Sequence, residues 1–257
     1  MPYRIRRIIG GEEFGAWQNP RTTSGVMAGL VPAIHAPERN EAGASFQRIC
    51  ALKRRDIPLI VVFDIGNVLL RWNPRNLYRK TFDDEARMER FLSTALAMDF
   101  VAHTDTAPDF AAAVETRAKA FPEFAGELRL FHERWIETLG GAIEENVALL
   151  RRLKAAGRPV HALSNFATDK FALAREQYDF LDAFDVAVIS GHVGAVKPEA
   201  RIYEILFERV GASPQDLLFI DDSPANVRAA EALGMAAIRF RPGVDLESEL
   251  AARGALP

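Results

Sequence analysis

Short apolar runs alternate with amphipathic stretches along the chain from Pro58 onward. Helical periodicity fills the intervals between the later runs, over Asp169–Tyr178, Pro198–Val210 and Pro224–Leu233. Apolar runs of about four to eight residues that alternate with helices are typical of strands buried on both faces. The pattern predicts an α/β fold, a Rossmann-like parallel sheet covered by helices, with strands in the runs PLIVVF, RPVHALS, DVAVIS, DLLFI and MAAIRF.

Prolines and glycines mark the expected ends of the helices. Ser223-Pro224 and Lys197-Pro198 each place a proline where the first turn of a helix tolerates it. Three glycines follow helical periods, where a left-handed cap is expected: Gly157, Gly211 and Gly234.

The alternation is interrupted from Asn73 to about Gly141, where helical periodicity continues and no strand is predicted. Apolar residues there recur at spacings of three and four, as on the buried face of a helix. Two such faces hold Met88, Phe91, Leu92, Ala95 and Leu96, and Leu128, Phe131, Trp135 and Leu139. We interpret residues 73–141 as a small all-helical cap inserted after the first strand, with residues 57–72 and 142–257 as the core.

The first 56 residues have a different character. They lack a sustained apolar period and are dense in Gly, Pro, Asn and Arg, and residues 1–57 carry nine Lys/Arg against five Asp/Glu. The only candidate for a signal peptide, VMAGLVPAIHA, is interrupted by Pro32. We interpret residues 1–56 as a poorly ordered extension that reflects a mis-called start; a basic interaction arm is the alternative.

The composition narrows the class of protein. Apolar residues make up 49% and charged residues 26%, as in ordinary globular proteins. The net charge of -3 argues against a nucleic-acid or membrane partner, and the single cysteine excludes a disulfide framework. We expect a cytoplasmic monomer or homodimer that acts on a small molecule.

Polar residues stand where predicted strands end. Asp64 follows VVF, Ser164-Asn165 end the second run, and Asp221-Asp222 end DLLFI. Ligands bind beyond the carboxyl ends of the strands in an open parallel sheet. Each residue alone has an ordinary explanation, because Asp, Ser and Asn are common turn and cap residues and a lysine such as Lys197 is usually solvated. Their convergence on one sheet edge predicts an active site.

The acid pair Asp221-Asp222 carries the most specific chemistry. Adjacent carboxylates repel each other, which raises the cost of ionising both. A divalent cation removes that cost, and Mg²⁺ prefers oxygen ligands. The pair therefore predicts a magnesium site, whereas His132 and His161 lack ligand partners at suitable spacing and are interpreted as structural. Trp135 is interpreted as packing, and Arg71-Trp72 as either packing or the entrance between core and cap.

Four motifs occur in order: FDIGNV at Asp64, LSN at Ser164, VKPEARIY at Lys197 and FIDDSPANV at Asp221-Asp222. In these motifs the sequence resembles the haloacid dehalogenase-like hydrolase superfamily, over about residues 58–245. It is most similar to the subgroup with sugar-1-phosphate phosphatases and the phosphatase domain of epoxide hydrolase. The resemblance implies a Rossmann-like sheet with a helical cap after the first strand.

The resemblance also implies roles for the residues of the motifs. Asp64 is expected to attack phosphorus and form an aspartyl-phosphate, which splits one difficult step into two. Lys197 is expected to pair with Asp64 and a phosphoryl oxygen. Ser164, Asn165 and Asn67 are the expected phosphate-binding groups.

A magnesium ion is implied in the same way. Its expected ligands are the carboxylates of Asp64 and Asp222, the backbone carbonyl of Gly66, and Asp221 through a bridging water. Asn226 is expected to support these carboxylates from behind.

Gly66 departs from the pattern of the family. Phosphatases of this superfamily usually place a second aspartate there, as the general acid and base, and such catalysis is typically worth ~10²–10⁴-fold. Asn67 is no substitute, because an amide does not titrate. Two residues of the predicted cap, His103 and Asp105, are candidates to supply the proton, and ordinary loop residues are the alternative.

Three functions therefore stay open. A magnesium-dependent phosphatase of small metabolites, with sugar phosphates favoured, tolerates the glycine if its leaving group is good. A metal-independent 2-haloacid dehalogenase needs no general acid, but it gains nothing from two further carboxylates. A non-catalytic binding protein with the same fold has no electrostatic reason to keep Asp64, Lys197 and both acids. The acid pair leads us to favour the phosphatase.

Overall fold

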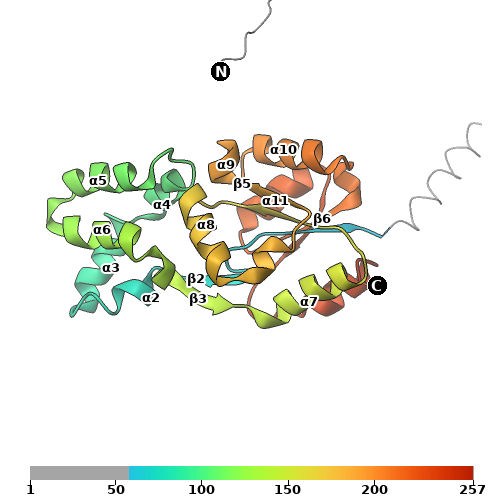
Figure 1. Cartoon of the computed structure of the whole chain (residues 1–257), viewed down its shortest axis with the longest axis horizontal. Coiled ribbons are helices and arrows are strands. Elements are labelled where there is room, and N and C mark those ends of the chain that lie inside the picture. Colours follow the sequence, from blue (N-terminus) through green and yellow to red (C-terminus); the bar gives the residue numbers. More distant parts are fainter. Residues whose placement is uncertain (1–57, 257) are drawn as a thin grey trace, which may run out of the picture. The chain divides into compact units, whose positions relative to one another are not determined.

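The computed structural model describes residues 58–256 (Figure 1). The extension predicted over residues 1–56 lies outside the described residues. Five parallel strands form a sheet in the order β5-β4-β1-β6-β7, which confirms the predicted α/β fold. The five apolar runs supply them: β1 Ile60–Phe63, β4 Val160–Ser164, β5 Val186–Ile189, β6 Leu217–Asp221 and β7 Ala236–Arg239.

The order of strands puts β1 at the centre. Val61 lies opposite Val160 of β4 on one side and Leu218 of β6 on the other. The chain adds β4 and β5 on one side of β1 and then returns to add β6 and β7 on the other. Ligands bind beyond the carboxyl ends of strands at such a change of direction.

Helices cover both faces of the sheet, so each face buries a separate set of side chains. Val61 and Phe63 pack in one cluster with residues of α7, α8 and α12. Val62, one residue between them, packs in another with residues of α10 and α11. These helices are α7 Glu144–Ala155, α8 Thr168–Gln177, α10 Ala200–Val210, α11 Pro224–Ala232 and α12 Leu246–Ala252, with the shorter α9 Ser190–Val193, η3 Asp179–Asp182 and η4 Pro214–Asp216.

Helices also fill the interval where the sequence predicts a cap. They are α2 Arg75–Tyr78, α3 Glu85–Ser93, α4 Met98–Thr104, α5 Phe110–Ala120, η1 Pro122–Phe124, α6 Ala125–Glu133 and η2 Trp135–Thr138. Aromatic rings hold them together: Phe91 lies 4.6 Å from Tyr78 and 5.3 Å from Phe124 between ring centroids. We call residues 75–138 the cap segment (Figure 1).

A short antiparallel ribbon precedes and follows the cap segment. It consists of β2, Leu70–Trp72, and β3, Leu139–Ala142, which pair with a register shift. The expectation of no strand up to Gly141 was wrong here. The sequence of β3 is LGGA, and its two glycines leave no alternation of apolar and polar side chains to detect.

The predicted helix ends are confirmed with one exception. Pro224 opens α11, and Gly157, Gly211 and Gly234 have φ of 70°, 68° and 92°. The helix α10, in contrast, begins at Ala200 rather than at Pro198.

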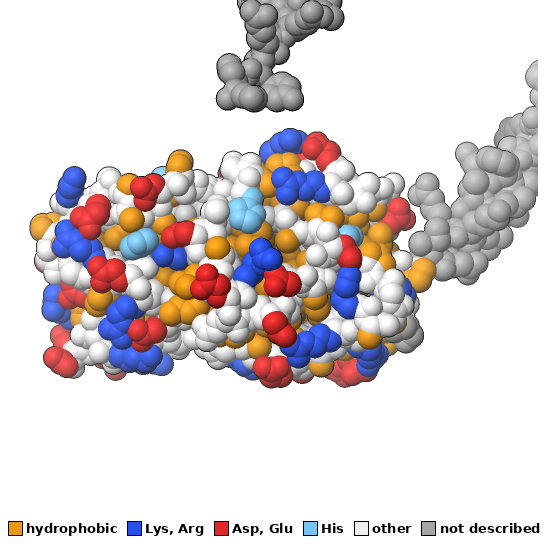
Figure 2. Space-filling view, in the orientation of Figure 1, with side chains coloured by type: hydrophobic (Ala, Val, Ile, Leu, Met, Phe, Trp, Pro, Cys, Tyr) orange, Lys and Arg blue, Asp and Glu red, His pale blue; other side chains and the backbone are white. Residues whose placement is uncertain are grey.

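The face seen in Figure 2 shows no large patch of like charge, because acidic and basic side chains are interspersed on it. Among the described residues, no helix is long and apolar enough to span a bilayer.

Candidate active site

Asp64 stands at the centre of the sheet edge. It follows the last residue of β1, is 6% exposed, and donates its backbone N–H to the carbonyl oxygen of Ile220 in β6 at 2.8 Å. The strand ends of β4 and β6 bring Ser164 and Asp221 to the same edge. The parallel sheet therefore gathers residues that lie up to about 160 positions apart in the sequence.

A buried lysine joins two of the carboxylates. Lys197 Nζ lies 2.8 Å from Asp64 Oδ1 and 2.7 Å from Asp221 Oδ2. Asp64 Oδ1 also accepts hydrogen bonds from Ser164 Oγ and from the backbone N–H of Ile65, both at 2.7 Å. Asp64 Oδ2 accepts no hydrogen bond from residues 58–256, so this oxygen is free to attack or to bind a cation.

The carboxylate of Asp221 is held from several sides. Asn226 Nδ2 donates to both of its oxygens at 3.1 Å, as the sequence predicts for a supporting amide. The backbone N–H of Ser223 donates to Oδ1 at 2.8 Å. Asp221 is completely buried and does not line the cavity, whereas Asp64 and Asp222 do.

Burial and mutual repulsion shape the protonation of this cluster. Burial raises the pKa of Asp64 to about 7, opposed by the charge of Lys197 and reinforced by that of Asp221. Burial also raises the pKa of Asp222, with the charge of Asp221 adding to the effect. Burial by itself lowers the pKa of Lys197, but Asp64 and Asp221 overcome it and raise that pKa. The lysine is therefore charged.

The donor set fits a hard divalent cation. Asp64, Asp221 and Asp222 each offer a carboxylate oxygen, and the three atoms lie within 4.8 Å of one another. With all groups ionised, three carboxylates and Lys197 leave two negative charges, which one divalent cation balances. Oxygen-only ligands of this kind suit Mg²⁺.

Asn165 has a structural task that the sequence did not reveal. Its Nδ2 donates to the carbonyl oxygen of Lys197 at 3.0 Å, and its Oδ1 accepts from the backbone N–H of Lys197 at 2.8 Å. The amide therefore aligns the loop that carries the lysine, while it also lines the cavity. No periodicity predicts such a contact, because the two residues lie on separate loops.

The turn after β1 leaves room at Gly66. A Cβ placed on this residue would meet no heavy atom within 4 Å, and its φ lies outside the positive range. The next residue, Asn67, has φ 53°, and its side-chain Oδ1 accepts from the backbone N–H of Trp72 at 3.0 Å. The absence of an acid at position 66 is therefore not a steric requirement of the turn.

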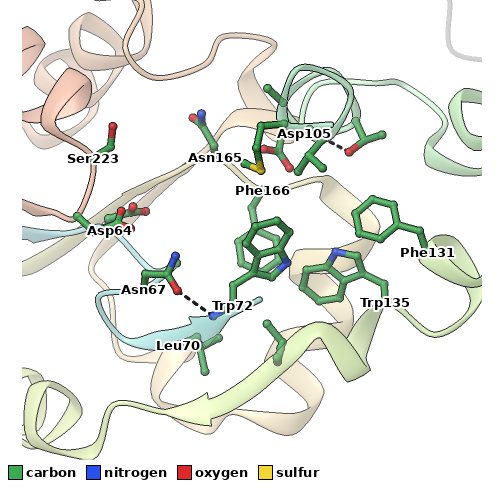
Figure 3. A pocket seen from close by; sticks show the side chains of 17 residues that line it. Asp64, Asn67, Leu70, Trp72, Asp105, Phe131, Trp135, Asn165, Phe166 and Ser223 are labelled. Atoms are coloured by element: carbon green, nitrogen blue, oxygen red, sulfur yellow. Dashed lines mark hydrogen bonds between the residues drawn. The ribbon is translucent and has the colours of Figure 1, made fainter. Parts of the chain in front are cut away.

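A cavity of about 300 Å³ opens in front of Asp64 (Figure 3). Both the strand ends and the cap segment line it. Asp105, at the end of α4, is among the lining residues. His103 is exposed and lines a different depression beside Arg117. The structure does not bring His103 into the cavity, which corrects the prediction for that residue.

Asp105 is an unusual carboxyl. Its side chain accepts no hydrogen bond from the described residues, although its backbone oxygen accepts from Ser190 Oγ at 2.9 Å. That contact ties the end of α4 to α9 beside the sheet. Burial raises the pKa of Asp105 to about 7, with Lys197 opposing and Asp64 reinforcing the shift. Asp105 can therefore carry a proton near neutral pH.

Within the apolar wall of the cavity, only Trp72 was anticipated from the sequence, where the entrance between core and cap was one of its two interpretations. Trp135, interpreted from the sequence as packing, is 6% exposed and lines the cavity, as Trp72 does. The ring of Trp135 lies 5.3 Å from that of Phe166, between centroids. The spacing of Trp135 within its helical face indicated burial, but not that a cavity lies beside it.

The chain matches the model of the haloacid dehalogenase-like hydrolases over residues 59–234, and it belongs to this family of hydrolases. The resemblance found in the four motifs is thereby confirmed.

Relatives with different reactions match parts of the chain. The sesquiterpene phosphatase astK of Aspergillus oryzae is 33% identical over 93 residues, which are 36% of this chain and 47% of that protein. The (S)-2-haloacid dehalogenase of Pseudomonas fluorescens is 32% identical over 85 residues, 33% of this chain and 37% of that protein. The chain thus spans less than half the length of each of these relatives.

The fold has close counterparts among solved structures. The HAD family enzyme bt-2542 from Bacteroides thetaiotaomicron, solved with magnesium and inorganic phosphate, superposes with a TM-score of 0.57. The two chains are 19% identical, and the match covers 75% of this chain and 98% of that one. This likeness concerns the fold.

Proposed function

We propose that this protein is a magnesium-dependent phosphatase of small phosphorylated molecules in the cytoplasm. One observation carries the proposal: three carboxylate oxygens within 4.8 Å of one another, with a single buried lysine among them. With all groups ionised, the site has two excess negative charges, which a divalent cation balances and which repel an anionic substrate when no cation is bound.

Asp64 is the proposed nucleophile. Its free Oδ2 attacks phosphorus, and the bond from phosphorus to the leaving oxygen breaks, which leaves an aspartyl-phosphate. Water then attacks phosphorus, the bond to Asp64 breaks, and inorganic phosphate departs. Lys197 and Ser164 hold Oδ1 at 2.8 Å and 2.7 Å, so the other oxygen keeps a fixed direction toward the cavity.

Asp64 and Asp222, with the carbonyl oxygen of Gly66, are the groups that would hold Mg²⁺ directly, and Asp221 would contact it through a bridging water. Bound there, the ion would neutralise the negative charge of the phosphoryl group. Lys197 adds a second positive charge on the side of Asp221. Asn67 and Asn165 line the cavity and are the proposed phosphate-binding amides.

Asp105 is the proposed proton donor in place of the acid absent at position 66. It lines the cavity opposite the strand ends, and its carboxyl accepts no hydrogen bond from the described residues. With a pKa of about 7, its carboxyl can protonate the leaving oxygen near neutral pH.

The dehalogenase remains the second candidate, because Gly66 and a similar dehalogenase both favour it. Displacement of halide from carbon needs no proton donor. The acid pair opposes it, since a carboxylate substrate would enter a site that already carries excess negative charge. A non-catalytic binding protein would not need the free oxygen of Asp64.

The test compares two reactions on the purified full chain, with Mg²⁺ or with EDTA. Phosphate release from p-nitrophenyl phosphate should require Mg²⁺ and should disappear in Asp64→Asn. The matched control is Asp179→Asn, a surface aspartate with a side chain that is 88% exposed. Halide release from 2-chloropropionate that survives EDTA would contradict the proposal. Mg²⁺ binding without either reaction would favour the binding protein.

A further inference from the structure

The cavity has two chemically different ends. The end at the sheet is polar and is formed by Asp64, Gly66, Asn67, Asn165, Asp222 and Ser223. The other end is lined largely by apolar and aromatic side chains, among them Trp72, Trp135, Phe131 and Phe166. Figure 3 shows these four rings grouped together, away from Asp64 and Ser223. The phosphoryl group belongs at the polar end, so the leaving group meets the rings.

The apolar end provides few hydrogen-bond partners. The hydroxyl of Thr104 is already used, because it donates to the carbonyl oxygen of Val101 at 2.7 Å. At the boundary, Asn67 Oδ1 accepts from the backbone of Trp72, and Asn165 is held by the backbone of Lys197. The N–H groups that these two amides keep free are assigned to the phosphoryl group. The carboxyl of Asp105 and the indole N–H groups of Trp72 and Trp135 remain as hydrogen-bond partners for a ligand at this end.

A sugar would be a poor occupant of such a wall. Each hydroxyl that loses water without gaining a partner costs about 1–3 kcal/mol. Apolar surface, in contrast, gains roughly 25 cal/mol for each Å² removed from water. Two indole donors and one carboxyl cannot pair all the donors and acceptors of several hydroxyls, whereas an apolar group leaves nothing unpaired.

We propose that the site selects phosphate monoesters of apolar alcohols, aromatic or short and branched, over those of sugars. The inference rests on the proposed phosphatase function and revises the preference for sugar phosphates drawn from the sequence. A cavity of about 300 Å³ is at the small end for ligand sites, which favours a compact group. Met98, 63% exposed, adds an apolar side chain to the lining and is accessible to solvent.

The experiment compares two esters that have similarly poor leaving groups, benzyl phosphate and glucose 6-phosphate. With Mg²⁺, kcat/KM for benzyl phosphate should exceed that for glucose 6-phosphate at least ~100-fold, the range for specificity in an apolar pocket. Equal or better hydrolysis of glucose 6-phosphate would overturn the inference and leave the phosphatase intact. Failure of both esters and of p-nitrophenyl phosphate would overturn the two together.

Variants of the wall sharpen the test. Trp135→Asn should lower the ratio of the two kcat/KM values about ten-fold or more. Met98→Asn should lower it in the same direction, and its exposed position avoids a loss of folding. The control Phe207→Leu, in α10 and away from the cavity, should keep the wild-type ratio. Ratios unchanged in both wall variants would contradict the inference.

Binding gives a readout that does not depend on turnover. The variant Asp64→Asn retains the wall, and Trp72 and Trp135 both line the cavity, so binding can be followed by the quenching of tryptophan fluorescence. The affinity of this variant for benzyl phosphate should be at least ten times higher than its affinity for glucose 6-phosphate. Equal affinities for the two esters would count against the proposal.

Discussion

At the scale of single residues, the chemistry turns on Gly66 and Asp105. The glycine leaves open space where the family usually has an acid, and the cavity wall holds a carboxyl with a raised pKa. A proton donor is defined by its reach to the leaving oxygen and by its pKa, not by its place in the sequence. The cap segment can therefore supply what the first motif lacks.

Gly66→Asp should fold and gain activity. The new Cβ meets no heavy atom within 4 Å, and an added acid can protonate the leaving oxygen. We expect kcat/KM for benzyl phosphate to rise roughly ten-fold or more, toward the ~10²–10⁴ typical of general acid catalysis. The control is Gly66→Asn, which has a side chain of the same size but no acidic proton to donate. A gain in both variants would indicate a packing effect.

Asp105→Asn should lower kcat/KM for benzyl phosphate by ~10²-fold or more and change that for p-nitrophenyl phosphate less than about ten-fold. The reason is that p-nitrophenolate leaves without a proton. A general acid works only when protonated, so the wild-type value for benzyl phosphate should fall as the pH rises above about 7, the pKa of Asp105. The variant should lose this limb of the profile. Equal losses on both esters would point to a structural role.

At the scale of elements, β4 and β6, two of the strands that carry the site, are buried along their whole length. All of β4, Val160–Ser164, is buried, and it includes one ionisable group, His161. The ring Nδ1 of His161 has no hydrogen-bond partner within residues 58–256. Burial lowers the pKa of His161, with Asp185 opposing the shift. This histidine supports no chemistry but links the stability of the sheet to pH.

His161→Leu should flatten the dependence of stability on acid. Because the folded pKa lies below the ordinary 6.5, the unfolded chain binds more protons as the pH falls through 6.5, and the free energy of unfolding decreases. The variant cannot bind this proton, so its loss of stability between pH 7.5 and 5.5, measured by urea unfolding, should be smaller. The exposed His103→Leu is the control and should match the wild type.

At the scale of the whole molecule, the site is a charge cluster assembled from four segments of the chain. Asp64, Ser164, Lys197 and Asp221 meet because β1, β4 and β6 are neighbours and Asn165 aligns the loop of Lys197. Excess negative charge at the cluster opposes folding when no cation is present. Binding of a cation should therefore increase the stability of the folded protein.

Mg²⁺ should raise the melting temperature. A ligand at one hundred times its dissociation constant adds about 2.7 kcal/mol, or roughly 5–10 °C for a domain of this size. Asp222→Asn should lose most of this shift. In EDTA it should be no less stable than the wild type, because burial raises the pKa of Asp222 and so disfavours its ionised form. Asp179→Asn should keep the shift; equal shifts in the two variants, measured by calorimetry, would place the ion elsewhere.

The sheet and its reactive edge follow from local patterns. Each strand has its own apolar run, and parallel strands necessarily present their carboxyl ends at one edge, so Asp64, Ser164 and Asp221 could be placed together without a structure. Asp221-Asp222 could be interpreted as a cation site from the sequence alone, because the two acids are adjacent and directly follow an apolar run.

The wall of the cavity and the choice between His103 and Asp105 needed the packed chain. Two residues apart on a helix differ by about 200° around its axis, so only one of them can face the site, and the orientation of α4 against the core decides which. The ribbon of β2 and β3 is too short and too rich in glycine to show a period. Which aromatic rings line the cavity, rather than fill the core, depends on contacts between segments that no local pattern records.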